Sequence, residues 1–186
     1  RFSMELIDIA DLAGQCDFGV FKSALASGGT VKCICVPGGG EMPRSQTDAL
    51  AEWAKDFGAK GLAVTKVTAT GVDTGIAKFL TPVAPKLIEA TGAKEGDLLC
   101  FAADTPKTVH KVLGELRLKM FRDLCMAIEE RRFQLLAHAI VPLADPSRPT
   151  QYELLVRLQD SHGLVLEPAR FLSAAKRYQL LPQLDR

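Results

Sequence analysis

Two pairs of residues in this sequence have the types and spacings that metal or phosphate chemistry uses. Cys33 and Cys35 alternate within an apolar run, so both side chains should face one side of a strand. Two thiolates on one face suit a metal, but no second ligand pair follows at zinc-site spacing, and we interpret them as small apolar core residues. Glu153 and Arg157 lie four residues apart in a second apolar run and should also share one face.

The other reactive residue types lack recognisable partners. His110 and His162 are predicted on a helix surface and in a turn, without the local context of a catalytic nucleophile. We interpret His138 as a structural strand residue and not as a base or a ligand. Pro37–Gly40 contains three consecutive glycines but lacks the lysine and the spacing of a P-loop. We predict that it forms a tight turn between a strand and a helix.

The composition is that of an ordinary globular protein. The 186 residues are 47% hydrophobic and 24% charged, and the net charge of +1 gives no global attraction for nucleic acid or anionic membranes. No apolar run approaches the ~20 residues of a membrane span, and the start has no signal-peptide pattern. The five cysteines form no CxxC pair, which fits a reduced, cytoplasmic protein. Because Arg1 is not an initiator, we expect the sequence to begin within a fold.

The first part of the sequence alternates between strand and helix patterns. Apolar runs predict strands at Val31–Val36, Gly61–Val67 and Asp97–Ala102. Apolar residues at helical spacing predict a helix from Ser45, as N-cap, to about Phe57, and a shorter one over Val83–Thr91. Gly58 and Gly92 stand where C-terminal caps are expected.

The second part begins with a long helix. Thr105 is its expected N-cap and Pro106 its first residue, and apolar residues then recur at spacings of three and four as far as Glu130, without a break at Met120. Beyond it we expect a hairpin of two strands and a last helix. The strands are Phe133–Pro142 and Tyr152–Leu158, the intervening turn contains Asp145–Pro149, and the helix opens at Glu167–Pro168 and includes Tyr178.

Residues 1–119 resemble the insertion domain of bacterial-type aspartyl-tRNA synthetase, often called the GAD domain. The resemblance is carried by Arg1–Phe2, Glu5–Asp8, Phe18–Phe21, Val36–Gly40, Phe57–Ala63, Ile76–Leu80, Thr91–Ala93, Gly96–Leu98 and Leu113–Leu118. It implies a folded α/β module that lies between pieces of a class II catalytic domain, on the tRNA side. It also implies that Lys55, Lys60, Lys66 and Lys78 contribute to an RNA-facing surface.

Residues 121–186 resemble the start of an EAL domain, the cyclic di-GMP phosphodiesterase family built on a TIM-like barrel. Phe133–Pro142, Tyr152–Leu158, Glu167–Tyr178 and Leu184–Arg186 carry this resemblance. It implies that Glu153 is a metal ligand and that Arg157 meets a phosphate. The sequence has His138–Ala139, Ser173 and Lys176 where the family usually has Gln-Pro, proline and glutamate. Because Mg²⁺ needs several oxygen ligands, one carboxylate leaves the metal site incomplete.

These observations lead to one set of expectations. The fold is α/β (α+β): a synthetase-insertion-like module, residues 1–119, is joined by a shared helix over about 106–130 to a hairpin-plus-helix fragment of a TIM-like barrel, residues 120–186. We expect a non-catalytic chimera or fragment, with no catalytic residue and no cofactor, and with Mg²⁺ only if the EAL-like site is completed. The alternatives are a module that binds cyclic di-GMP or another nucleotide, and a tRNA-facing accessory module. The expected partners are a second copy through exposed strands, tRNA or cyclic di-GMP, and no membrane.

Overall fold

The computed structural model describes residues 4–143, 151–159, 163, 165–166, 168–177 and 179–184. Predictions for Arg1–Phe2, Asp145–Pro149, His162, Glu167, Tyr178 and Asp185–Arg186 lie outside the described residues. The chain divides into two compact units, residues 1–121 and 122–186.

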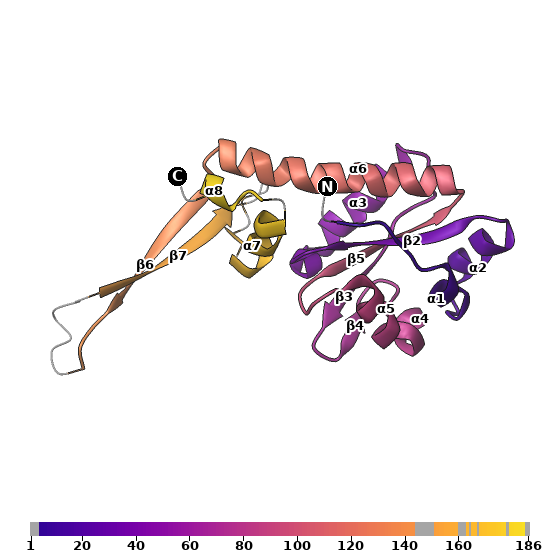
Figure 1. The fold of residues 1–186 in the computed structure, drawn as a ribbon, viewed down its shortest axis with the longest axis horizontal. Coiled ribbons are helices and arrows are strands. Elements are labelled where there is room, and N and C mark those ends of the chain that lie inside the picture. The colour runs from indigo at the N-terminus through magenta and orange to yellow at the C-terminus, as the bar shows by residue number, and fades with distance from the viewer. Residues whose placement is uncertain are drawn as a thin grey trace. The chain divides into compact units, whose positions relative to one another are not determined.

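The first unit is built on a five-stranded antiparallel sheet in the order β1-β2-β5-β3-β4 (Figure 1). The strands are β1 Ile7–Asp8, β2 Thr30–Val36, β3 Ala63–Thr68, β4 Gly71–Asp73 and β5 Leu98–Asp104. The central pair, β2 and β5, consists of near-continuous apolar residues because both of its faces are covered. The predicted strands are therefore confirmed, each to within two residues.

Helices cover both faces of this sheet (Figure 1). One face carries α1 Ala10–Gly14, α2 Gly19–Ala26, α4 Ala77–Leu80, the 3₁₀ turn η2 Thr81–Val83 and α5 Ala84–Thr91. Its core centres on Phe21, whose ring lies 4.9 Å from that of Phe18 and 5.8 Å from that of Phe101. The opposite face carries α3 Arg44–Lys55 and the first half of α6 Pro106–Glu129. Leu50, Ala54, Val109, Val112, Leu113 and Leu116 are buried there.

The helix boundaries follow local capping chemistry. Thr105 caps α6, since its Oγ1 accepts a hydrogen bond from the Thr108 amide at 3.4 Å. Gly92 ends α5 in the left-handed conformation, as predicted. The predicted cap at Ser45 is wrong: the N-cap is Pro43, two residues earlier, and the N-terminus of α3 has no side-chain cap. The helix α6 continues through Met120, as its apolar period predicts.

The second unit contains a three-stranded antiparallel sheet in the order β6-β7-β8. The strands are β6 Phe133–Ile140, β7 Gln151–Gln159 and β8 Val165–Leu166, and they precede α7 Pro168–Arg177 and α8 Leu181–Leu184. The predicted hairpin is confirmed, with Phe133 opposite Leu158 and Ile140 opposite Gln151. The mixed α/β class is confirmed for both units, and the assignment of this sheet to a TIM-like barrel stays a prediction.

Candidate functional site

The glycine run after β2 is a turn whose amides are used within the protein. The Gly38 amide donates to Oδ1 of Asp97 at 2.9 Å, and the Gly40 amide donates to the Gly96 carbonyl at 2.8 Å. A Cβ at Gly40 would lie 2.7 Å from that carbonyl oxygen, so the backbones approach too closely for a side chain. The arrangement supports the interpretation of Pro37–Gly40 as a structural turn.

The cysteines predicted as core residues lie in the core. Cys33 and Cys35 are buried among the side chains on the face that α1, α2, α4 and α5 cover. Burial raises the pKa of the Cys33 thiol well above its ordinary value, and the neighbouring Cys100 and Cys35 add to the effect. Among the residues that the structure describes, no group of three histidine, cysteine or acidic side chains is placed to hold a metal ion.

The EAL-like residues occupy one face of the hairpin. Glu153 and Arg157 are both in β7, and alternation puts them on the same side of the strand. Their cross-strand neighbours in β6 are His138 and Gln134. Glu153 and His138 are exposed, and the half-buried Arg157 donates to the Val156 carbonyl at 3.0 Å. A metal role for Glu153 and a phosphate role for Arg157 stay predictions.

The four lysines predicted to face RNA do not form one free surface. Lys55 pairs with Glu52 at 2.6 Å, and Lys66 pairs with Glu41 at 3.2 Å. Lys78 lies over the Phe79 ring, 4.7 Å from its centroid, on α4 and so across the sheet from α3. Among the described residues, only Lys60 of these four has neither an ion pair nor a ring contact.

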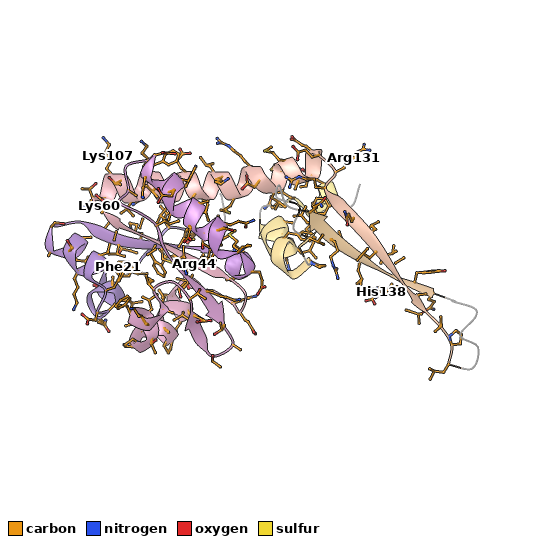
Figure 2. The ribbon with its side chains drawn as sticks, turned by 180° about the vertical axis from the view of Figure 1, so that it is seen from behind. Phe21, Arg44, Lys60, Lys107, Arg131 and His138 are labelled. Atoms are coloured by element: carbon orange, nitrogen blue, oxygen red, sulfur yellow. The ribbon has the colours of Figure 1, made fainter. Side chains whose placement is uncertain are left out.

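A different group of lysines gathers where the end of α3 meets the start of α6. The Lys111 ammonium lies 5.8 Å from the centroid of Phe57, and the Phe57 ring lies 4.6 Å from that of Trp53. Lys107 precedes Lys111 by one helical turn, and Lys60 follows Phe57 by three residues. Figure 2 shows Lys60 and Lys107 at the same end of the first unit. We call Trp53, Phe57, Lys60, Lys107 and Lys111 the lysine–aromatic surface.

Three lysines give this surface positive charge. Lys60, Lys107 and Lys111 are exposed, and within the described part of the chain none of them forms an ion pair. The first turn of α6 contains no acidic residue, so the partial positive charge of the helix end adds to that of Lys107. Half-buried aromatic rings beside free ammonium groups are what single-stranded or looped RNA contacts through bases and phosphates. The i, i+4 spacing of Lys107 and Lys111 was the available sequence signal, whereas their proximity to Phe57 required the fold.

The first unit has a mixed α/β fold, in which helices cover both faces of an antiparallel sheet. Residues 21–113 match the family model described as the GAD domain. The aspartate–tRNA ligase of Enterococcus faecalis (strain V583) is 44% identical over 137 residues, covering 73% of this chain and 23% of that protein. The aspartate–tRNA(Asp/Asn) ligase of Bacillus subtilis (strain 168) is 48% identical over 138 residues, with the same coverage. The chain belongs to the GAD domain family.

The matched stretches place limits on the remaining predictions. The chain spans about a quarter of the length of these curated relatives, 23% to 24%. The aspartate–tRNA ligase of Halalkalibacterium halodurans is 44% identical over 147 residues and covers 78% of this chain. That coverage exceeds residues 1–121, so the likeness to synthetases extends into the second unit. A junction at Met120 and a chimeric origin stay predictions. No helix in the described ranges has both the length and the apolar character that a membrane span requires.

Proposed function

We propose that this chain acts as the insertion module of an aspartate–tRNA ligase and contacts tRNA without contributing catalytic groups. The observation that carries the proposal is the match of residues 21–113 to the GAD domain, together with relatives that bear the ligase name. The lysine–aromatic surface supplies chemistry suited to a phosphate backbone. In this role the rigid sheet positions the surface, and the whole enzyme's catalytic domain performs aminoacylation.

A charge-reversal variant tests this role. We expect Lys60→Glu/Lys107→Glu/Lys111→Glu to weaken tRNA binding at low salt by about tenfold or more and to reduce the salt dependence of log K by about 2, because three phosphate contacts are lost. A glutamate near the start of α6 interacts favourably with the partial positive charge of the helix N-terminus, so the variant should remain folded. Gel-shift and fluorescence titrations between about 50 and 200 mM salt measure both quantities.

A second triple variant controls for net charge. Lys78, Lys86 and Lys94 are exposed. Lys78 lies in α4 and Lys86 in α5, across the sheet from α3, and Lys94 follows the end of α5 by three residues. Their replacement by glutamate changes the net charge equally and should weaken binding by less than about threefold at the same salt. Equal losses in the two variants would mean that tRNA responds to overall charge alone, and salt-insensitive or absent wild-type binding would refute the role.

We also propose that the EAL-like segment binds cyclic di-GMP through Arg157 and Glu153. The shared face of these two residues supports the proposal, with a guanidinium for phosphate and a carboxylate for a hard cation. Calorimetry with cyclic di-GMP and Mg²⁺ should then give a binding heat that Arg157→Ala abolishes and Gln134→Ala retains. A titration without heat at millimolar ligand would exclude this second function.

A further inference from the structure

The hairpin of β6 and β7 has two faces of opposite character. Every second residue along a strand lies on the same face, and residues that are directly opposite on the two strands also share a face. One face, which we call the apolar face, consists entirely of apolar side chains: Phe133, Leu135, Ala137, Ala139, Tyr152, Leu154, Val156 and Leu158. The other, the mixed face, carries every charged residue of the two strands together with His138. The hairpin therefore has the pattern of a sheet buried on one side.

Only one end of the apolar face is covered. Phe171 of α7 packs against Phe133, with ring centroids 5.4 Å apart, and Leu158, Phe171 and Ala175 are buried. At the other end Leu135 is 69% exposed, Leu154 65% and Tyr152 60%. Figure 1 shows β6 and β7 extending beyond α7. A contiguous apolar patch of this kind on a protein surface marks an interaction site.

The charge and the shape of the exposed end indicate its occupant. The apolar face contains no formal charge, so two identical faces meet without burying a charge, whereas self-association of the mixed face would remove Glu153 and Arg157 from water. The uncovered end also pairs small residues with large ones, since Ala137 lies opposite Leu154 and Ala139 opposite Tyr152. When two copies stack, Leu154 and Tyr152 on β7 of one copy can lie over Ala137 and Ala139 on β6 of the other. A single surface thus supplies both the protruding and the receiving halves of an isologous contact.

We propose that the chain forms a homodimer in which the apolar faces of two β6–β7 hairpins stack on one another. The contact buries Leu135, Leu154 and Tyr152 of both copies and leaves the mixed face, with Glu153 and Arg157, open to solvent. The proposal is independent of tRNA binding, which involves the first unit. It differs from pairing of β6 edges, because edge pairing would leave the apolar face uncovered.

Adjacent residues on opposite faces give a sharp test in the full chain. Leu135 and Leu136 are neighbours in β6 and lie on the apolar and the mixed face, with exposures of 69% and 43%. Sedimentation equilibrium at about 100 µM should give twice the chain mass of 20.1 kDa for the wild type and for Leu136→Glu. Leu135→Glu should give a single chain mass at the same concentration, because each copy would bury a carboxylate opposite an apolar surface.

A second pair of variants repeats the test on β7. Tyr152→Lys changes the apolar face and Gln151→Lys changes the mixed face one residue away, and both positions are exposed. Because these side chains are solvated in a single copy, the variants should retain the wild-type circular dichroism spectrum. The inference is overturned if the wild type is a monomer, if its mass rises with concentration without reaching a plateau at the dimer, or if the mixed-face variants dissociate as readily as the apolar-face variants.

Discussion

Replacement of Gly75 by alanine is expected to destabilise the first unit by about 3 kcal/mol or more. Gly75 has a φ of +55°, and a Cβ built there would lie 1.9 Å from the carbonyl oxygen of Val64. That oxygen belongs to β3 and accepts a hydrogen bond from the Ile76 amide at 3.1 Å. The obstructing atom is backbone in a strand paired with the central β5, so relief requires a shift of the sheet itself.

Urea unfolding followed by tryptophan fluorescence measures this loss in the first unit, because the single tryptophan, Trp53, lies in α3. Gly92→Ala is the matched control. Gly92 has a nearly identical φ of +59°, but no atom lies within 4 Å of a Cβ built there. This control should cost only the left-handed backbone penalty, about 1 kcal/mol. If the two substitutions cost the same, the close approach of Gly75 to Val64 is not a constraint on the fold.

Long elements with a single periodicity were predictable from the sequence, and short ones were not. The strands β2 and β5 were predictable because each is a continuous apolar run bounded by turn residues. The helix α6 was predictable because its apolar residues recur at spacings of three and four over many turns, which a strand does not show. The elements β1, β4 and α4 contain 2, 3 and 4 residues, fewer than a periodic pattern needs. The helix α2 was missed because Gly19 opens it without a capping side chain.

The choice among individual lysines is limited in a different way. Whether a lysine is free to bind RNA depends on which acid the fold places beside it. Lys66 is neutralised by Glu41, which is 25 positions away in the sequence. Phe57 and Lys111 come together because α3 and α6 cover the same face of the sheet. The resemblance predicts an RNA-facing surface, but the choice of individual lysines for that surface requires the tertiary contacts.

Asp97 illustrates the same limit for a buried polar residue, since its sequence context indicates only the start of a strand. In the structure its side chain joins three segments. Oδ1 accepts a hydrogen bond from the Gly38 amide at 2.9 Å, and Oδ2 accepts one from the Lys94 amide at 2.9 Å and one from the Cys35 thiol at 3.4 Å. The Asp97 carbonyl also accepts from the Val67 amide at 2.9 Å. The carboxylate therefore holds the glycine turn against the 94–97 turn and the sheet.

We expect Asp97→Ala to destabilise the first unit by about 2–4 kcal/mol, because two backbone amides lose a charged acceptor in a site where water cannot easily replace it. Asp97→Asn should cost about 1–3 kcal/mol, since its amide group retains one acceptor and places a donor against the other backbone N–H. Urea unfolding monitored by Trp53 fluorescence gives both values. In hydrogen exchange, the Gly38 and Lys94 amides should lose protection in the alanine variant while amides in the centre of β5 keep it.

Asp56→Asn provides the comparison for the loss of one negative charge. Asp56 is exposed at the end of α3, where its side chain forms no ion pair with the described residues, and its substitution should change stability by less than about 0.5 kcal/mol. Comparing the two variants shows whether Asp97 stabilises the fold through its local hydrogen bonds or only through its negative charge. If Asp97→Ala is as mild as Asp56→Asn, or if Gly38 and Lys94 remain protected without the carboxylate, then backbone contacts alone hold the glycine turn and the buried aspartate is dispensable.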